Sequence, residues 1–312
     1  MPSWNGLRGR CCLTTEADLA ERPPGTVPAP EVPDSRAARP CFELAFRRDG
    51  SGRSFVGAQY VRYPVHVGRG LHTDGAAPDM CVVYLQSVSG GLFEHDQVDG
   101  RIEVAAGAAA HVATPASTVV HAMSGGSAGQ TAALIAAPGA LLEYMPAPVI
   151  LFPGSHLRSR TTVSLAPDAL VLVAETFLAH DHAGGGDGFA RFESAVDVSD
   201  EAGTLLARER MRIDGDAWRA ATVAVAAGMR VHGSLWVLRR GAGDVLHAAL
   251  LDAAAAAEAD GAYAGASRLP GDAGVVFRVL GPDAVSVERA QHRAWSAVRT
   301  VHAGRAPALR RR

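Results

Sequence analysis

The segment LIAAPGALLEY, residues 134–144, decides the fold class. An apolar run is followed by Ala, a two-residue turn and another Ala, and then by a second apolar run, which is the form of a strand–turn–strand unit. The same form occurs in two further segments, IEVAAGAAAHV (102–112) and VSLAPDALVLV (163–173). The turns at Gly107, Gly139 and Asp168 recur about every thirty residues, a period typical of repeat architectures. Because one unit cannot bury its own apolar face, the pattern predicts stacked units that share a core. A run of ordinary hairpins in a sandwich is the alternative.

The flanking segments add strands before and after these units, and helices only near the C-terminus. Strands are expected in CFELAF (41–46), SFVGAQYVRYPVHVG (54–68), MCVVYLQSV (80–88), GFARFESAVDVSDEAGTLLARERMRI (188–213), WRAATVAVAAGMRVHGSLWVLRR (218–240) and GVVFRVLG (274–281). Helical spacing predicts one helix over 244–260, with Asp244 as its N-cap, and a second over 283–304, with a stripe from Val287 to Val301 and Gly304 as its end. We therefore predict a mainly β protein, a β-solenoid-like scaffold of stacked sheets with two helices near the C-terminus.

The composition excludes several classes of function. The chain has 312 residues, of which 48% are hydrophobic, and this is enough to bury a substantial core. A formal net charge of −2 provides no electrostatic basis for binding nucleic acid or an anionic membrane. All 30 basic residues are arginine, which excludes a lysine nucleophile or Schiff base. The chain contains no GxSxG, P-loop or HExxH motif, so a serine hydrolase, NTPase or zincin is not expected.

Three regions are expected along the chain. Residues 1–40 are rich in Pro, Ala and Arg and are predicted to be a disordered extension, 41–304 a β-rich domain, and 305–312 a basic tail. The four cysteines have no metal-binding spacing, and the N-terminus lacks the pattern of a signal peptide, so we expect a reduced, cytoplasmic protein. The uncharged stretch 111–142 is broken by Pro and Gly and is not expected to cross a membrane.

Two buried acids are the most informative candidates for a site. Glu143 and Glu175 both interrupt apolar strands. Burying an unpaired carboxylate costs roughly several kcal/mol of free energy, so a partner or water must compensate each charge. One interpretation is a structural ion pair of Glu143 with Arg158 or Arg160, which lie just downstream. The other is a hydrated interior in which the acids line a route for a cation. On that second interpretation, Glu143→Ala is expected to fold nearly normally.

A polar loop offers a second candidate site. The segment AHDHAGGGDG (179–188) contains His180, His182 and Asp187, whose imidazole and carboxylate groups suit Ni or Zn. A solvated loop is the alternative interpretation. The segment LFEHD (92–96) places Asp96 after a double glycine and is open to the same two interpretations.

Four segments, in order, resemble the urease accessory protein UreD family, also called UreH. They are SGGLFEHD (89–96), HVATPASTVVHA (111–122), GALLEYMPAPVILFPGS (139–155) and YAGASRLPGDAGVVFRVLGPD (263–283), the last being followed by Trp295 and Arg299. The resemblance spans roughly 41–303. It departs from the family pattern at His95, which replaces a glycine, and at His180 and Asp181, which occupy a Gly-Arg position.

The resemblance implies a scaffold rather than an enzyme. Such a protein would deliver nickel to apo-urease in a complex with UreF and the GTPase UreG, without a tightly bound cofactor and with Ni²⁺ bound only transiently. A water-filled passage would carry the ion, with Glu143, Asp96, Glu175 and Asp187 as candidate wall acids and His180 and His182 as candidate metal ligands. Two alternatives compete with this interpretation: a metal-dependent enzyme centred on His180, His182 and Asp187, and a β-repeat binding module.

Overall fold

The structure is a computed structural model in which residues 39–308 are described. By its internal contacts the chain divides before Pro40, and the description concerns only the unit that follows. The predicted disordered extension, apart from its last two residues, and the end of the predicted basic tail lie outside the described residues.

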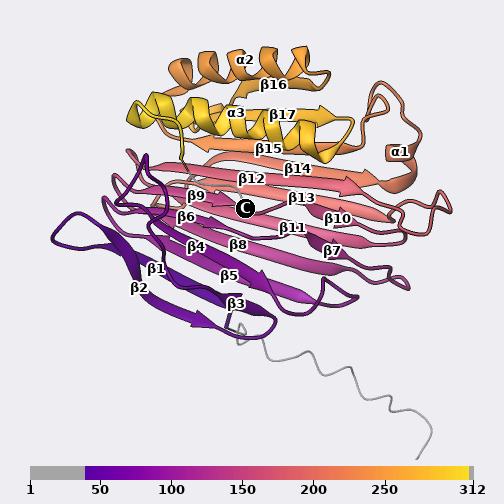
Figure 1. The fold of residues 1–312 in the computed structure, drawn as a ribbon, viewed down its shortest axis with the longest axis horizontal. Coiled ribbons are helices and arrows are strands. Elements are labelled where there is room, and N and C mark those ends of the chain that lie inside the picture. The colour runs from indigo at the N-terminus through magenta and orange to yellow at the C-terminus, as the bar shows by residue number, and fades with distance from the viewer. Residues whose placement is uncertain (1–38, 309–312) are drawn as a thin grey trace, which may run out of the picture. The chain divides into compact units, whose positions relative to one another are not determined.

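Two sheets form the described unit (Figure 1). The seven-stranded sheet has the order β14-β13-β11-β8-β5-β1-β2 and consists of β1 (Phe42–Arg48), β2 (Ser54–Val61), β5 (Gln97–Val104), β8 (Ala128–Ala136), β11 (His156–Leu165), β13 (Arg191–Ser199) and β14 (Leu205–Asp214). The ten-stranded sheet has the order β16-β17-β15-β12-β9-β6-β4-β3, and in addition β10 pairs with β12 and β7 pairs with β10. It consists of β3 (Val65–Val67), β4 (Cys81–Ser87), β6 (Ala109–Ala113), β7 (Thr118–Val120), β9 (Leu141–Met145), β10 (Val149–Leu151), β12 (Leu170–Ala179), β15 (Val231–Leu238), β16 (Tyr263–Arg268) and β17 (Gly274–Gly281).

The three sequence repeats form the central turns of a β-solenoid. In each repeat the first strand (β5, β8 or β11) belongs to the seven-stranded sheet and the second (β6, β9 or β12) to the ten-stranded sheet, and equivalent strands pair in parallel. The turns stack on one another: the Gly107 N–H donates to the Pro138 carbonyl over 3.0 Å, and the Gly139 N–H donates to Asp168 Oδ1 over 3.0 Å. The predicted β-solenoid-like fold is confirmed, with about four turns.

Residue alternation along the strands separates two apolar layers. Leu142 and Tyr144 of β9 face the seven-stranded sheet and belong to the core between the sheets. Leu141 and Met145 face the opposite side, where α2 (Gly243–Ala259) and α3 (Ala284–Ala303) cover the ten-stranded sheet. Figure 1 shows both helices beside β15, β16 and β17. Glu143 shares the helix-covered side because side chains in a strand alternate between faces.

The two long helices agree with the sequence patterns, apart from details at their ends. The prediction of Asp244 as an N-cap is wrong: the N-cap of α2 is Ala242, and Asp244 lies in the first turn, where it pairs with Arg268. Helix α3 is capped by Asp283, which accepts from the Ser286 N–H, and ends at Gly304 with a φ of 70°. Val301, predicted on the apolar stripe of α3, is 41% exposed.

Two predicted strands are shorter than expected. Within 218–240 only Val231–Leu238 is a strand, because Trp218 lies in the short helix α1 (Gly215–Arg219) and turns occupy the residues between them. The segment 54–68 is divided into β2 and β3 around Pro64, which has no N–H to donate to a ladder. The segment 188–213, predicted as strand, forms the antiparallel pair β13 and β14, which is joined by a turn at DEAG (200–203).

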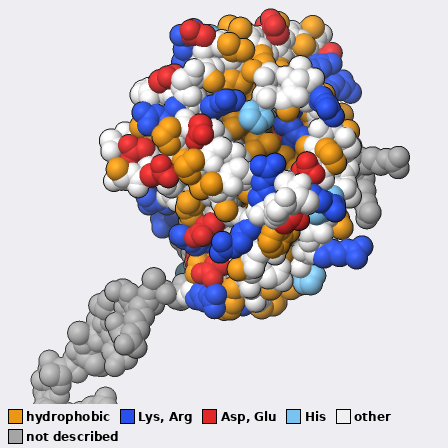
Figure 2. Space-filling model, turned by 90° about the vertical axis from the view of Figure 1, so that its left-hand side faces the viewer, with side chains coloured by type: hydrophobic (Ala, Val, Ile, Leu, Met, Phe, Trp, Pro, Cys, Tyr) orange, Lys and Arg blue, Asp and Glu red, His pale blue; other side chains and the backbone are white. Residues whose placement is uncertain are grey.

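The described surface mixes charges and apolar groups. Figure 2 shows arginine and acidic side chains interspersed with hydrophobic ones over one face of the protein. Among residues 39–308, no helix has both the length and the apolarity that crossing a membrane requires.

Candidate functional site

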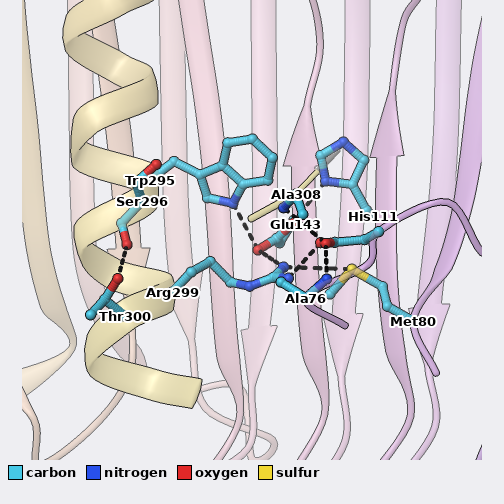
Figure 3. A network of polar contacts seen from close by, with 10 residues as sticks. Ala76, Met80, His111, Glu143, Trp295, Ser296, Arg299, Thr300 and Ala308 are labelled. Carbon is cyan, nitrogen blue, oxygen red and sulfur yellow. Dashed lines mark hydrogen bonds and ion pairs between the residues drawn. The ribbon is translucent and has the colours of Figure 1, made fainter. Parts of the chain in front are cut away.

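Glu143 lies in the layer between the ten-stranded sheet and α3, and it is fully buried. Its two carboxylate oxygens are occupied by protein groups. The Trp295 indole N–H and Arg299 Nη1 both donate to Oε1 over 2.8 Å, and His111 Nδ1 lies 2.8 Å from Oε2. Figure 3 shows Trp295 and Arg299 reaching Glu143 from α3, with His111 on the opposite side.

Arg299 joins Glu143 to a second buried acid. Its Nη2 donates to Asp74 Oδ2 over 2.6 Å, and its Nη1 also lies 3.7 Å from the Met80 sulfur. The other oxygen of Asp74 accepts from the backbone N–H groups of Ala76 and Ala308 (Figure 3). One guanidinium therefore serves two buried carboxylates.

Electrostatics keeps this network charged. Burial alone would raise the pKa of Glu143, but the hydrogen bond and charge of His111, the charge of Arg299 and the Trp295 hydrogen bond hold this pKa below its ordinary value. Burial disfavours the charged Arg299, yet Glu143 and Asp74 raise the pKa of its guanidinium. The cluster is a closed ion-pair network rather than an open ligand set.

The sequence prediction for Glu143 is correct about burial and about the need for compensation, but wrong about its partner. Arg158 and Arg160 lie on the outer face of β11 and pair with Glu193 and Asp197. Glu143 lies on the helix-covered side of the ten-stranded sheet. A cavity lies between the two sheets, and Glu143 is not among the residues that line it.

Glu175 occupies a different position, in the wall of a cavity between the two sheets. The cavity has a volume of about 480 Å³. The acid lies deep within the protein, and the surface that it keeps faces this space. Apart from Glu175 and Arg160, the lining combines apolar groups with neutral polar ones, among them Phe42, Leu85, Val98, Thr114, Gln130, Tyr144, Ser159, Thr161 and Thr176. Exposed residues Gln86, Ser87 and Val88 also contribute to the lining, so the cavity reaches the surface there.

A hydrogen-bonded row of polar side chains leads to Glu175. Gln130, Ser159 and Ser194 occupy matching positions on β8, β11 and β13. Gln130 Nε2 donates to Ser159 Oγ over 3.2 Å, and Ser194 Oγ donates to Glu175 Oε2 over 2.7 Å. Burial raises the pKa of Glu175, and the serine hydrogen bonds only partly oppose that effect. The row provides oxygen ligands of the kind that hydrated divalent cations accept.

The remaining candidate acids lie on loops. Asp96 is half-buried and accepts the backbone N–H of Phe93 over 2.8 Å. Asp187 is exposed. Neither is among the residues that line the cavity.

The candidate ligands His180 and His182 lie on a loop beside the ring of Phe152. The Phe152 ring lies 4.5 Å from the His182 ring and 6.0 Å from the His180 ring, centroid to centroid, and His121 is 5.6 Å away on another loop. Asp181 cannot readily join them, because its carboxylate accepts three backbone N–H groups of its own loop. Within residues 39–308, no group of three or more His, Cys, Asp or Glu side chains is arranged to hold a metal ion.

Comparison with known proteins agrees with these features. A family model described as UreD urease accessory protein matches residues 38–312. The chain belongs to this family.

Several UreD relatives are similar over most of their length. Urease accessory protein UreD 1 of Pseudomonas syringae pv. syringae (strain B728a) is 38% identical, over 86% of this chain and 94% of its own. Urease accessory protein UreD 1 of Methylorubrum extorquens (strain PA1) is 37% identical, over 94% of this chain and 98% of its own. UreD proteins are non-catalytic accessory proteins of urease, so the alternative of a metal-dependent enzyme centred on His180, His182 and Asp187 is set aside.

Proposed function

We propose that this UreD-family protein is a scaffold for urease maturation that guides Ni²⁺ into apo-urease, in a complex with UreF and the GTPase UreG. One observation carries the nickel part of the proposal: Glu175 lines an internal cavity of about 480 Å³ that reaches the surface. Family membership carries the link to urease.

The lining of the cavity suits a cation that binds weakly and is released again. Glu175, Ser159 and Gln130 offer oxygen atoms to a partly dehydrated ion without enclosing it. A full cage would hold the ion too tightly to release it, which is the compromise that ion pores make. A cation in the cavity would favour the ionised form of Glu175, the form that burial disfavours.

The other candidates take different roles in this proposal. Glu143 holds α3 to the sheet through Arg299, so we assign it to the architecture of the protein rather than to the route. Asp96 and Asp187 are proposed as further acids on the route, and His180 and His182 as transient ligands, all at the loops. Nickel is the cargo, and no tightly bound cofactor is proposed.

The test compares two isosteric variants in a maturation assay. Apo-urease is produced with the partner proteins of its own operon and with wild-type protein, Glu175→Gln or Glu103→Gln. Glu103 lies on the outer face of the seven-stranded sheet and serves as the matched control. We expect Glu175→Gln to reduce both nickel per urease, measured by mass spectrometry, and urease activity, and Glu103→Gln to match wild type.

Two results would contradict the proposal. Wild-type nickel loading with Glu175→Gln would remove Glu175 from the route. Failure of the wild-type protein to support any loading would remove the maturation role itself.

A further inference from the structure

Strand β14 is an open edge of the seven-stranded sheet. Among the described strands it pairs only with β13 and is the last in the sheet order. The short helix η2 (Pro270–Asp272) lies against its start at Leu206, and the edge beyond that point is open. The hydrogen bond from the Gly215 N–H to the Ala190 carbonyl fixes which residues of β14 point their backbone groups toward β13. Because these groups alternate in an antiparallel pair, the N–H and C=O groups of Arg208, Arg210 and Arg212 point away from β13, toward the open side.

The same three arginines project their side chains from the outer face of the sheet. Their side chains are 55%, 46% and 57% exposed. The outer faces of β11, β13 and β14 together carry twice as many guanidinium groups as carboxylates, namely Arg158, Arg160, Arg191, Arg208, Arg210 and Arg212 against Glu193, Asp197 and Asp214. Asp197 alone is shared by three of these arginines, so donor N–H groups remain available.

The opposite face of β14 borders a hollow that combines apolar and charged groups. Met211 and Ile213 of β14 line a cavity of about 660 Å³ that extends between this strand and β16, the edge strand of the other sheet. Apolar and aromatic side chains line much of it, among them Phe177, Trp218, Val225, Tyr263 and Leu280. Charged residues line the rest, including Arg210 and Arg212 at the strand edge, Glu258, and the ion pair of Glu209 with Arg278. Tyr263 is 56% exposed.

We propose that the edge of β14 is a docking site for an extended segment of a partner protein in which carboxylate and apolar side chains alternate. A strand added to this edge would pair with the free backbone groups of Arg208, Arg210 and Arg212. Its side chains would point alternately to the two faces of the extended sheet. One set would meet the arginines and the other the apolar groups of the cavity beside Met211 and Ile213, so the pattern of the partner follows from the pattern of β14.

The charges select this occupant over two others. A second copy of β14 would place arginine opposite arginine, which is unfavourable between neighbouring strands. A nucleic acid would contact the arginines but would leave the edge N–H and C=O groups and the apolar groups of the cavity without complementary groups. The arginines also protect the edge from indiscriminate pairing, as charges on edge strands commonly do. This inference goes beyond nickel delivery and does not depend on it.

The test uses a labelled eight-residue peptide of alternating Glu and Val and the full-length protein. We expect saturable binding by fluorescence anisotropy, weakened by added salt, with slower amide hydrogen exchange in residues 205–214 in the complex. Replacing one exposed charge should weaken binding about threefold, and the variant R208Q/R210Q/R212Q should weaken it about tenfold or more. R47Q/R101Q, on the outer face of the same sheet but away from β14, is the matched control and should bind as wild type.

A second variant and two further ligands keep the proposal falsifiable. R212Q alone tests the charge if the triple variant does not fold, because the guanidinium of Arg212 lies 3.9 Å from its only carboxylate partner in the described part of the chain. A peptide N-methylated at every residue has no backbone N–H to donate along either of its edges, so it cannot pair with β14 and should not bind. Equal binding of that peptide, wild-type binding by R212Q, no binding of the original peptide, or its displacement by octathymidylate would each overturn the proposal.

Discussion

Arg299 of α3 and Glu143 of β9 are 156 residues apart in the chain, yet Arg299 Nη1 and Glu143 Oε1 lie 2.8 Å apart. Both side chains are buried, with 1% and 0% exposed. Trp295 and His111 fill the remaining positions around the carboxylate. The pair therefore fastens the last helix to the outer face of the ten-stranded sheet.

Glu143→Ala should be strongly destabilising. Removing one partner leaves the guanidinium of Arg299 buried with Asp74 as its remaining carboxylate, and such changes cost about 3–5 kcal/mol. The free energy of unfolding in urea measures the effect. The control is Arg158→Met, which removes an arginine that is 64% exposed in its ion pair and should cost less than about 1 kcal/mol. If Glu143→Ala is as stable as wild type and yet fails in urease activation, a role for Glu143 on the nickel route is supported instead.

Glu175→Gln should increase the free energy of unfolding, whereas Glu143→Ala should decrease it. The folded-state pKa of Glu175 is raised, so ionisation above the ordinary pKa of 4.5 opposes folding. The glutamine variant should be more stable than wild type at pH 7, and the difference should vanish as the pH falls below 4.5. For Glu143 the folded-state pKa is lowered, so its contribution is present above 4.5 and is lost as the pH falls below that value. Urea unfolding of both glutamine variants from about pH 2 to about pH 7 separates the two cases, and parallel pH profiles would contradict them.

His232 should make the protein sensitive to mild acid. Its Nδ1 is buried without a partner in the described part of the chain, and burial lowers the pKa of the ring from 6.5 to about 4. The unfolded chain therefore binds a proton that the folded protein does not, and stability should fall by roughly 3 kcal/mol between pH 6.5 and pH 4. His232→Phe should flatten this part of the profile of unfolding free energy against pH. The same replacement at the exposed His66 should leave the profile unchanged; an unaltered profile in His232→Phe would contradict the assignment.

Gly139→Ala should show how much the turn stack depends on glycine. The φ of Gly139 is 66°, a conformation that costs a residue with a side chain about 1–2 kcal/mol. Thermal unfolding should detect the loss. Gly50→Ala is the matched control, because Gly50 does not have a positive φ and a side chain there meets no neighbour within 4 Å. Equal melting temperatures for the two variants would show that the turn tolerates the change.

Local patterns predicted the fold better than they predicted the site. The repeat at 134–144 was sufficient to predict stacked strands, because the period of the turns and the alternation of apolar residues are both local features. The alanines and valines of 218–240 suit several structures, so their local pattern predicts strand throughout. Only tertiary packing shows that 218–230 forms a short helix and turns instead.

The site is formed by contacts between residues that are far apart in the chain, and local sequence patterns do not predict such contacts. Burial of Glu143 and Glu175 could be predicted from their apolar neighbours. Which acid faces α3 and which faces the cavity could not, because the alternation along a strand does not say which side a helix covers. Asp74 and His111 gave no signal before the structure, since their partners are far away in the chain.

The hydrogen bond between Arg299 and Asp74 joins residues that are 225 positions apart in the chain. The Ala308 N–H donates to the same aspartate from 234 positions away. During synthesis Glu143 leaves the ribosome long before Arg299 does. Until Arg299 has been made, the carboxylate of Glu143 lacks the guanidinium that balances its charge. Helix α3 therefore cannot yet pack as a layer on the ten-stranded sheet and bury this carboxylate. Translation must therefore pass Arg299 before this layer reaches its final form, and a nascent chain interrupted earlier would expose the defect to chaperones and proteases.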